Sequence, residues 1–280
     1  MTPESGHTVL ITNGTGKTGR RLGERLDRLG VPVRLGSRNG ATTFDWGDRR
    51  TWKAALDGAS AAYVTYVPDL AATGATTVIE AFTDAALAAG TRRLVLLSGR
   101  GEEEAQECEK IVAGSGADWT VLRCSWFAQN FDEGYLLDPI LAGEVALPAG
   151  DVGEPFVDLD DVAEVAAAVL TGDGHLGEVY ELTGPGLLTF SEAVDVIART
   201  AGIPIVYRRI SPAEFTAALD PETPADIVEL LSYLFTTVLD GRNAHLGDGV
   251  QRALGRQPRD FAAYAHAAAA TGVWTAGGTR

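Results

Sequence analysis

The sequence is poor in the residues from which disulfide frameworks and metal sites are built. It has only two cysteines, Cys108 and Cys124, and no CxxC pair, so neither a disulfide framework nor a structural zinc site is supported. Its four histidines show no metal-binding spacing such as HExxH. We therefore expect no metal, and a reducing, cytoplasmic location is the default.

Positive charge is also scarce. The chain has 23 Lys and Arg against 38 Asp and Glu, a formal net charge of −15. Because non-specific nucleic-acid binding and docking on anionic membranes both need a basic face, neither is expected. No apolar run has the length of a membrane span, and residues 1–7 are too short and polar for a signal peptide. The expected partner is a small molecule, and the oligomeric state stays open.

What the sequence does contain is a regular alternation of strands and helices in its first half. The expected strands are TVLIT (8–12), VPVRLGSR (31–38), AAYVTYV (61–67), RRLVLLSG (92–99) and DWTVLR (118–123). The run 92–99 has little polar alternation, which is typical of a strand covered by helices on both faces. This rhythm predicts an α/β, Rossmann-like, doubly wound parallel sheet that binds its ligand at the carboxyl ends of the strands.

After about residue 130 the pattern changes, because strands become sparse and helical spacing dominates. We therefore expect a dinucleotide-binding core over residues 1–130 and a smaller, mostly helical substrate-binding lobe over residues 131–280. The turns rich in Pro and Gly between these parts predict a lobe interleaved with the core rather than an independent domain.

The stretch VLITNGTGKTGRRL (9–22) fits two phosphate-binding loops, GxGxxG and GKT. A nucleoside-triphosphatase loop, GxxxxGK[ST], needs a glycine where this chain has Ile11, so that interpretation fails. The GxGxxG glycines, in contrast, follow an expected strand and open an expected helix, as a dinucleotide-binding loop requires. A plain Asn-Gly turn between unrelated elements is the simpler alternative.

The residues after the second strand favour one dinucleotide over the other. NAD(H) is usually held there by an acidic residue on the ribose hydroxyls, whereas the 2′-phosphate of NADP(H) is bound by Arg or a hydroxyl. The chain has LGSRNG (35–40), with Ser37 and Arg38 and no carboxylate. The sequence thus favours NADP(H), although Arg38 could also be an ordinary exposed arginine in a turn.

With these motifs in order, the chain resembles the NmrA-like branch of the atypical short-chain dehydrogenases/reductases over nearly its whole length. The motifs TNGTGKTG (12–19), LRCSWFAQN (122–130), PFVDLDDVA (155–163) and LTGPGLLTFSE (182–192) carry the resemblance. Within that family it is most similar to the ergot-alkaloid reductases of the festuclavine and agroclavine dehydrogenase kind. Two positions depart from the family pattern, since Asn13 stands where a glycine is usual and Cys124 replaces a proline.

The resemblance implies a site that runs from the glycine loop to the ends of the middle strands. The implied cofactor-binding residues are Asn13, Gly14, Thr15, Gly16, Lys17, Thr18, Ser37, Arg38, Asp45, Trp46, Thr65, Tyr66 and Val67. In the expected pocket region, the aromatic residues that offer a surface for substrate are Tyr66, Trp126, Phe127 and Phe131. Ser98, at the end of an expected strand, is the catalytic candidate that would orient the substrate, and a strand-ending hydroxyl that caps the next turn is nearly as good an explanation.

The usual proton donor of short-chain reductases is absent, since none of the seven tyrosines has a lysine four residues later. The run GRGEEEAQECEK (99–110) occupies the usual helix, and its glutamates are most simply a solvated face. Reduction of an iminium ion needs no proton donor, whereas reduction of a ketone does. We therefore expect an NADPH-dependent oxidoreductase acting on a small, aromatic or heterocyclic iminium, quinone or carbonyl compound. A non-catalytic NADP(H)-sensing regulator, or a non-redox enzyme that uses the cofactor structurally, is the alternative.

Overall fold

The computed structural model describes residues 8–275, and the expectation about a signal peptide at residues 1–7 lies outside that range. The chain divides into two compact units. The first contains the described part of Met1–Cys124 together with Leu159–Glu181 and Gly249–Arg256. The second contains Ser125–Asp158, Leu182–Asp248 and the described part of Gln257–Arg280.

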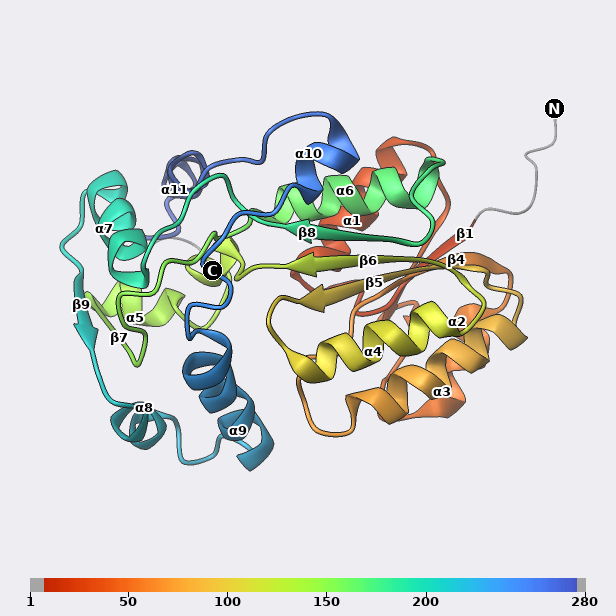
Figure 1. Cartoon of the computed structure of the whole chain (residues 1–280), viewed down its shortest axis with the longest axis horizontal. Helices are drawn as coiled ribbons and strands as arrows, with labels where there is room; N and C mark the ends of the chain where they lie inside the picture. Colours follow the sequence, from red (N-terminus) through yellow and green to blue (C-terminus); the bar gives the residue numbers. More distant parts are fainter. Residues whose placement is uncertain (1–7, 276–280) are drawn as a thin grey trace. The chain divides into compact units, whose positions relative to one another are not determined.

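A seven-stranded sheet forms the centre of the first unit (Figure 1). Its pairings β2–β3, β1–β2, β1–β4, β4–β5 and β5–β6 are all parallel. The predicted Rossmann-like fold is therefore confirmed. In spatial order, the strands are β3 (Thr42–Thr43), β2 (Val33–Ser37), β1 (Thr8–Ile11), β4 (Ala59–Val64), β5 (Arg93–Gly99), β6 (Asp118–Cys124) and β8 (Glu178–Leu182).

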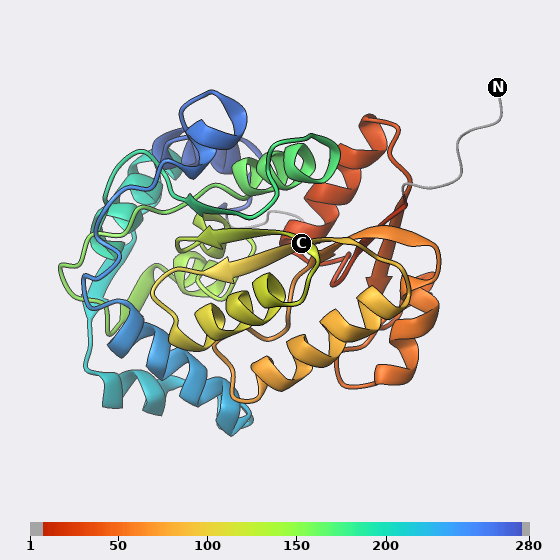
Figure 2. The ribbon, with the colours of Figure 1, turned by 45° about the vertical axis from the view of Figure 1, so that its right-hand side comes forward.

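Helices cover both faces of this sheet, which explains why most residues of its central strands β1, β4 and β5 are buried (Figures 1 and 2). Helix α1 (Lys17–Arg28) packs against α6 (Leu159–Thr171), which also contacts α10 (Gly249–Leu254). On the other face, α3 (Ala75–Ala88) packs against α4 (Glu103–Gly114) and α2 (Trp52–Leu56).

Apolar spacing within the elements fixes how they dock. In α1, Leu22 and Leu26 lie one turn apart and both are 0% exposed, so this helix buries a narrow stripe, while its arginines are half-buried or exposed. In β5, the run Leu94, Val95 and Leu96 is also 0% exposed. The first unit thus has the core that its sequence pattern predicts.

The division differs from the predicted boundary at residue 130. The first segment of the first unit ends at Cys124, and the later segments Leu159–Glu181 and Gly249–Arg256 return to this unit. Residues 178–182, which fall within the predicted second lobe, form β8 of the large sheet beside β6. The reason is topological, because α6 and β8 extend the sheet and its helical layer and bury their apolar residues there.

The second unit is mostly helical, with one two-stranded parallel sheet of β7 and β9. Helix α7 begins with a capping box between Thr189 and Glu192 and ends at Gly202, whose φ of 68° suits glycine. The elements of this unit are a short 3-10 turn (Ala128–Asn130), α5 (Leu137–Ala142), β7 (Glu144–Leu147), α7 (Phe190–Ala201), β9 (Val206–Arg209), α8 (Pro212–Ala218), α9 (Ala225–Tyr233), a π turn (Leu234–Val238) and α11 (Phe261–Ala270).

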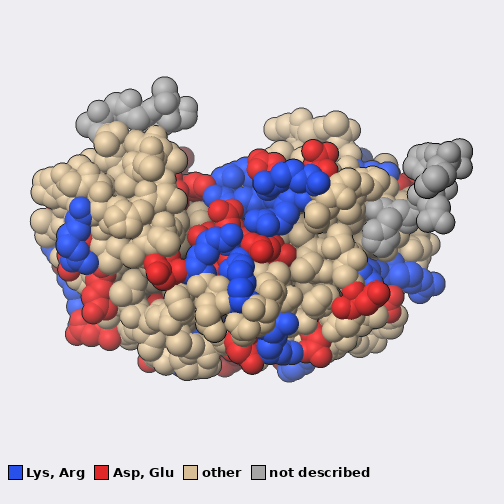
Figure 3. All heavy atoms as spheres, turned by 90° about the horizontal axis from the view of Figure 1, so that it is seen from above, with Lys and Arg blue, Asp and Glu red and all other residues tan. Residues whose placement is uncertain are grey.

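Arginines gather on the face of the first unit formed by α1, α6 and α10, but acidic residues lie between them (Figure 3). Arg21 pairs with Asp160 at 3.3 Å, and Arg256 contacts both Asp161 and Glu164 at 2.7 Å. These ion pairs neutralise the arginines locally. Within residues 8–275, no helix is long and apolar enough to cross a membrane.

Candidate functional site

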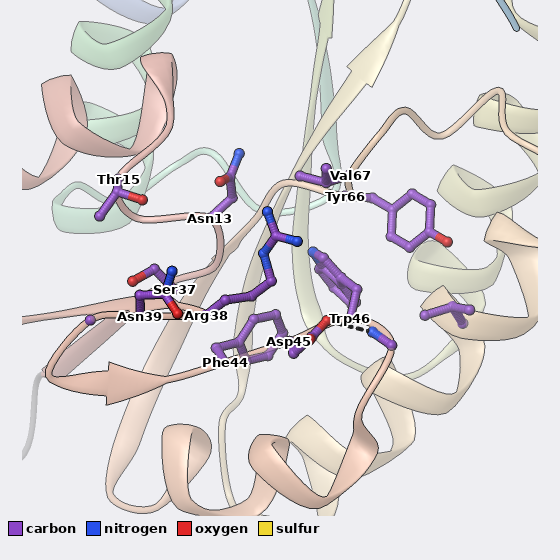
Figure 4. Close-up of a pocket in the computed structure, with 13 residues that line it drawn as sticks. Asn13, Thr15, Ser37, Arg38, Asn39, Phe44, Asp45, Trp46, Tyr66 and Val67 are labelled. Atoms are coloured by element: carbon purple, nitrogen blue, oxygen red, sulfur yellow. Dashed lines mark hydrogen bonds between the residues drawn. The ribbon is translucent and has the colours of Figure 1, made fainter. Parts of the chain in front are cut away.

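The strand order of the first unit creates a crevice at the carboxyl end of β1. Strand β1 lies between β2 and β4, so the connections that leave β1 and β4 run over opposite faces of the sheet. Ligands of open α/β sheets bind at such a point, where the winding direction changes. The segments after β1, β2, β3 and β4, together with Val78 of α3, line a cavity of about 590 Å³ there (Figure 4).

The sequence identified most of the residues that line this cavity. The predicted residues that the structure brings together there are Asn13, Thr15, Ser37, Arg38, Asp45, Trp46, Tyr66 and Val67. The sequence analysis did not identify five other lining residues, because they belong to no recognisable motif. These are Asn39, Gly40, Phe44, Gly47 and Val78.

The glycine loop between β1 and α1 is too tight for side chains. A Cβ on Gly14 would lie 2.7 Å from Cα of Leu35, and one on Gly19 would lie 2.4 Å from the carbonyl oxygen of Asn13. The amide of Gly14 also donates to the carbonyl of Gly36 in β2, at 2.7 Å. The loop therefore lies directly against the neighbouring strand, and its glycines are a steric requirement.

The N-terminus of α1 opens into this loop and can receive an anion. Gly16 is the N-cap residue, and no side chain caps the helix there. The first N–H groups of a helix carry partial positive charge and lack partners within the helix. Together with Lys17, the first residue of α1, they form a cradle suited to a pyrophosphate. Thr18 is buried behind this cradle, with 4% of its surface exposed.

The turn after β2 supplies the positive charge of the cavity. Ser37 ends the strand, and Arg38 follows it with an exposed side chain that points into the cavity (Figure 4). Among the described lining residues, Arg38 is the one cation and Asp45 the one carboxylate. The cavity can thus bind a phosphate group at Arg38.

Trp46 is held firmly as an aromatic wall of the cavity. Its Nε1 donates to the carbonyl of Thr65 at 3.0 Å. Its ring meets Phe44, Phe82 and Tyr66 at centroid distances of 5.0, 5.0 and 5.2 Å, with the rings close to edge-on. A flat ligand ring can therefore pack on the indole ring of Trp46, whose position is already fixed by these contacts.

Hydroxyl groups at the ends of β1 and β4 and in the loop after β4 lie at the same edge of the sheet. The Oγ1 of Thr12 accepts from the amide of Thr65 at 2.8 Å and thereby ties the ends of β1 and β4 together. The hydroxyls of Tyr63 and Thr65 are buried and have no hydrogen-bond partner within residues 8–275. Burial raises the pKa of Tyr66, so its hydroxyl keeps its proton at neutral pH.

Ser98 lies in a polar cluster at the ends of β5, β6 and β8. It is 5% exposed, and its Oγ donates to Oε1 of Glu109 at 2.6 Å. Arg123 also binds Glu109 and reaches Oε1 of Glu181 at 3.2 Å. This pairing raises the pKa of Arg123. The hydroxyl of Ser98 therefore has a structural partner, and its catalytic role stays a prediction.

The predicted substrate-binding aromatics of the second unit differ in exposure. Trp126 and Phe127 are both half-buried, and Trp126 packs on Phe190 at 5.3 Å. Phe131 is 0% exposed and contacts Phe156 at 5.5 Å, so its packing does not support a contact with substrate. Roles for Trp126 and Phe127 stay predictions.

No family model matches the sequence. Relatives nevertheless match over nearly its whole length. The chain is 30% identical to the uncharacterized oxidoreductase YesF of Bacillus subtilis, covering 95% of this chain and 98% of that protein. It is 31% identical to the (4-alkanoyl-5-oxo-2,5-dihydrofuran-3-yl)methyl phosphate reductase of Streptomyces griseus, covering 90% and 95%. It is 29% identical to the agroclavine dehydrogenase of Claviceps fusiformis, covering 91% and 95%.

Two solved structures show the same fold. The NADPH-dependent quinone oxidoreductase QOR2 of Escherichia coli, complexed with NADPH, matches with a TM-score of 0.76 and 24% identity, covering 92% of this chain and 98% of that one. NmrA, a negative transcriptional regulator, matches with a TM-score of 0.69 and 17% identity, covering 93% and 95%. The chain belongs to the NmrA-like family of atypical short-chain dehydrogenases/reductases.

This NmrA-like chain accommodates both of its departures from the family pattern. Asn13 has a φ of 51°, a left-handed conformation that Asn adopts more readily than most residues. Cys124 is 5% exposed, and burial raises the pKa of its thiol far above the usual range. A buried, protonated thiol is a poor nucleophile, so Cys124 fills space at the end of β6.

The acidic run at the start of α4 is only partly solvated. Glu103 and Glu104 are exposed as expected, but Glu102 is 8% exposed and Glu109 is 6% exposed. The two buried residues correct the prediction of a fully solvated face. The described residues contain no cluster of three His, Cys, Asp or Glu that could hold a metal ion.

Proposed function

We propose that this chain is an NADPH-dependent reductase of a small aromatic or heterocyclic electrophile. The observation that carries the proposal is the cavity at the β1 switch point, where a steric glycine cradle and the cation Arg38 lie at one edge of the sheet. A dinucleotide with an extra phosphate matches both features. The names of the oxidoreductase relatives agree with this activity.

We infer that residues of the first unit would hold the cofactor. The cradle from Gly14 to Thr18 would hold the pyrophosphate, and Ser37 and Arg38 the 2′-phosphate. Asp45 and Trp46 would flank the adenine, while the loop 65–67 would line the nicotinamide side. When bound there, NADPH supplies a hydride. This form of the cradle requires glycine at Gly14 and Gly19, because a Cβ at either position would collide with backbone atoms.

We infer the substrate class from the aromatic side chains that were predicted to bind substrate. Tyr66 lines the cavity in the first unit, and Trp126 and Phe127 are half-buried in the second. Aromatic faces attract flat and cationic groups, which suits an iminium ion or a quinone. An iminium carbon is already activated by its charged nitrogen, so its reduction works without a Tyr-Lys pair.

The test measures NADPH consumption by the purified protein through the loss of NADPH absorbance. Cyclic iminium ions, quinones and aromatic ketones are offered in turn as substrates. Turnover of any of these supports the reductase and identifies the electrophile. The same preparation should bind NADPH more tightly than NADH in calorimetry. Tight NADPH binding without turnover of any electrophile would instead favour an NADP(H)-sensing regulator, and absence of binding would contradict both.

A further inference from the structure

The chain presents three consecutive polar side chains to the cavity where β2 ends. Ser37, Arg38 and Asn39 all line this cavity (Figure 4). Within residues 8–275, none of the three side chains has a hydrogen-bond or ion-pair partner. A hydroxyl, a guanidinium and an amide all donate hydrogen bonds. The turn after β2 therefore offers several donors to a ligand that is rich in acceptors, such as a phosphate group.

The backbone of Ser37 is fixed by its neighbours in the sheet. Ser37 pairs with Thr43 of β3, and its carbonyl accepts from the amide of Phe44 at 3.0 Å. The preceding residue, Gly36, accepts from the amide of Gly14 in the glycine loop at 2.7 Å. The position of the Ser37 hydroxyl therefore depends on rotation about χ1, which has three staggered minima.

Gly40 provides the space in which the Ser37 hydroxyl lies. Gly40 lines the same cavity, and a Cβ on this residue would lie 2.3 Å from Oγ of Ser37. The same Cβ would lie 3.6 Å from Cβ of Ser37 and 3.8 Å from the carbonyl oxygen of Leu35, which are ordinary van der Waals distances. An alanine at position 40 would thus conflict with the hydroxyl of Ser37 and with no backbone atom.

This surrounding distinguishes Gly40 from the glycines of the cradle. A Cβ on Gly14 or Gly19 would collide with backbone atoms, so those two positions require glycine for the shape of the loop. Gly40 meets no backbone in this way, and it is not among the described residues with a positive φ. Backbone conformation therefore does not require glycine at position 40, whereas the present position of the Ser37 hydroxyl does.

We propose that Gly40 is a positioning residue for NADPH, because it keeps the hydroxyl of Ser37 where it donates to the 2′-phosphate beside Arg38. The proposal rests on the NADPH site proposed above and adds a second determinant of cofactor choice. Arg38 supplies positive charge, and the hydroxyl supplies a directional donor. NADH has a neutral hydroxyl in place of the phosphate, so displacement of the Ser37 hydroxyl weakens NADPH binding more than NADH binding.

The decisive variant is Gly40→Ala. Its methyl group should rotate the Ser37 hydroxyl away from the phosphate, and loss of one hydrogen bond to a charged group should raise the NADPH Kd about tenfold. The NADH Kd should stay within about twofold of wild type. Because only the end of one side chain has to move, the melting temperature should stay near that of wild type. Isothermal titration with both dinucleotides and a thermal melt measure these effects.

A second glycine in the same unit provides the matched control. Gly114, the last residue of α4, is exposed and is not among the residues with a positive φ. A Cβ on Gly114 would have nothing within 4 Å, so Gly114→Ala should leave both affinities unchanged. Ser37→Ala removes the hydroxyl directly and should weaken NADPH binding as much as Gly40→Ala does.

The double variant tests whether Gly40 acts through Ser37. Without Oγ, the nearest atom to the new methyl group is Cβ of residue 37, at an ordinary contact distance of 3.6 Å. Gly40→Ala should therefore have no further effect when it is combined with Ser37→Ala. The NADPH Kd of the double variant should equal that of Ser37→Ala within about twofold, a strongly non-additive result.

Different failures separate this proposal from the proposed function. Unchanged NADPH affinity in Gly40→Ala or in Ser37→Ala would overturn it, and so would additive losses in the double variant. Equal weakening of NADPH and NADH in Gly40→Ala would indicate a distorted turn and would also overturn it. A wild-type protein that binds neither dinucleotide would overturn the cofactor site itself. Binding without turnover of any electrophile would contradict the reductase and leave the role of Gly40 intact.

Discussion

Removal of the Arg38 guanidinium gives the sharpest test of cofactor choice. Arg38 is the one cation among the described residues that line the cavity, and it follows directly after β2. If it binds the 2′-phosphate, Arg38→Ala removes a charge-assisted contact that NADH never makes. The substitution should therefore weaken NADPH binding and leave NADH binding almost unchanged.

The expected magnitude follows from the exposure of Arg38. Hydrogen bonds to charged groups contribute about 1.5–3 kcal/mol, and each 1.4 kcal/mol corresponds to about a tenfold change in affinity. Because the side chain is exposed, solvent screening favours the lower part of this range, so the NADPH Kd should rise about tenfold. Isothermal titration of both dinucleotides at low and high salt measures the effect, which should shrink as salt is added.

A nearby arginine outside the cavity provides the control. Arg50 pairs with Asp48 at 2.7 Å, its side chain is 91% exposed and it does not line the cavity, so Arg50→Ala should leave both affinities unchanged. Equal weakening of NADPH and NADH by Arg38→Ala would refute the assignment, since that pattern indicates a general distortion of the loop. An unchanged NADPH affinity would show that Arg38 is an ordinary surface residue.

Three further outcomes are expected. Gly16→Val should abolish dinucleotide binding in calorimetry but leave thermal melting near wild type, because its Cβ would meet the movable side chain of Asn13, 2.5 Å away. Phe131→Ala should lower the free energy of unfolding in urea by about 3–5 kcal/mol, because its ring is 0% exposed, while the folded protein keeps its NADPH affinity. Glu102 has a raised pKa, so at this group the folded state binds more protons than the unfolded state, and the contribution of Glu102 to wild-type stability should fall as pH rises above about 4.3. Glu102→Gln should flatten this fall in melting temperatures recorded from about pH 5 to about pH 9.

The sequence was sufficient for those parts of the fold that depend on neighbours along the chain. Strands β1, β4, β5 and β6 are short apolar runs bounded by turns, and the helices between them have clear apolar stripes. The glycine loop was recognisable because its strand, its glycines and its helix are consecutive. Arg38 could be placed for the same reason, since a residue directly after β2 must lie at the carboxyl edge of the sheet.

Long-range contacts were beyond the reach of local pattern. Strand β8 follows more than 50 residues after β6 and still lies beside it, so its membership of the first sheet depends on tertiary pairing. Trp126 and Phe131 look alike as aromatic residues near one loop. They differ in their contacts with residues far away in the sequence. The ring of Phe131 packs against Phe156 and Phe261, and its carbonyl oxygen accepts a hydrogen bond from Nε1 of Trp274 at 2.9 Å.

The acidic run at the start of α4 shows how one buried acid can be hidden in a surface-like sequence. Three consecutive glutamates indicate a solvated face, and Glu103 and Glu104 follow that rule. Glu102 differs because Gly99 leaves room for its carboxyl group, while burial and the neighbouring charge of Asp69 raise its pKa. An ionised carboxylate without a partner is costly to bury, so the environment that removes Glu102 from water also keeps it protonated.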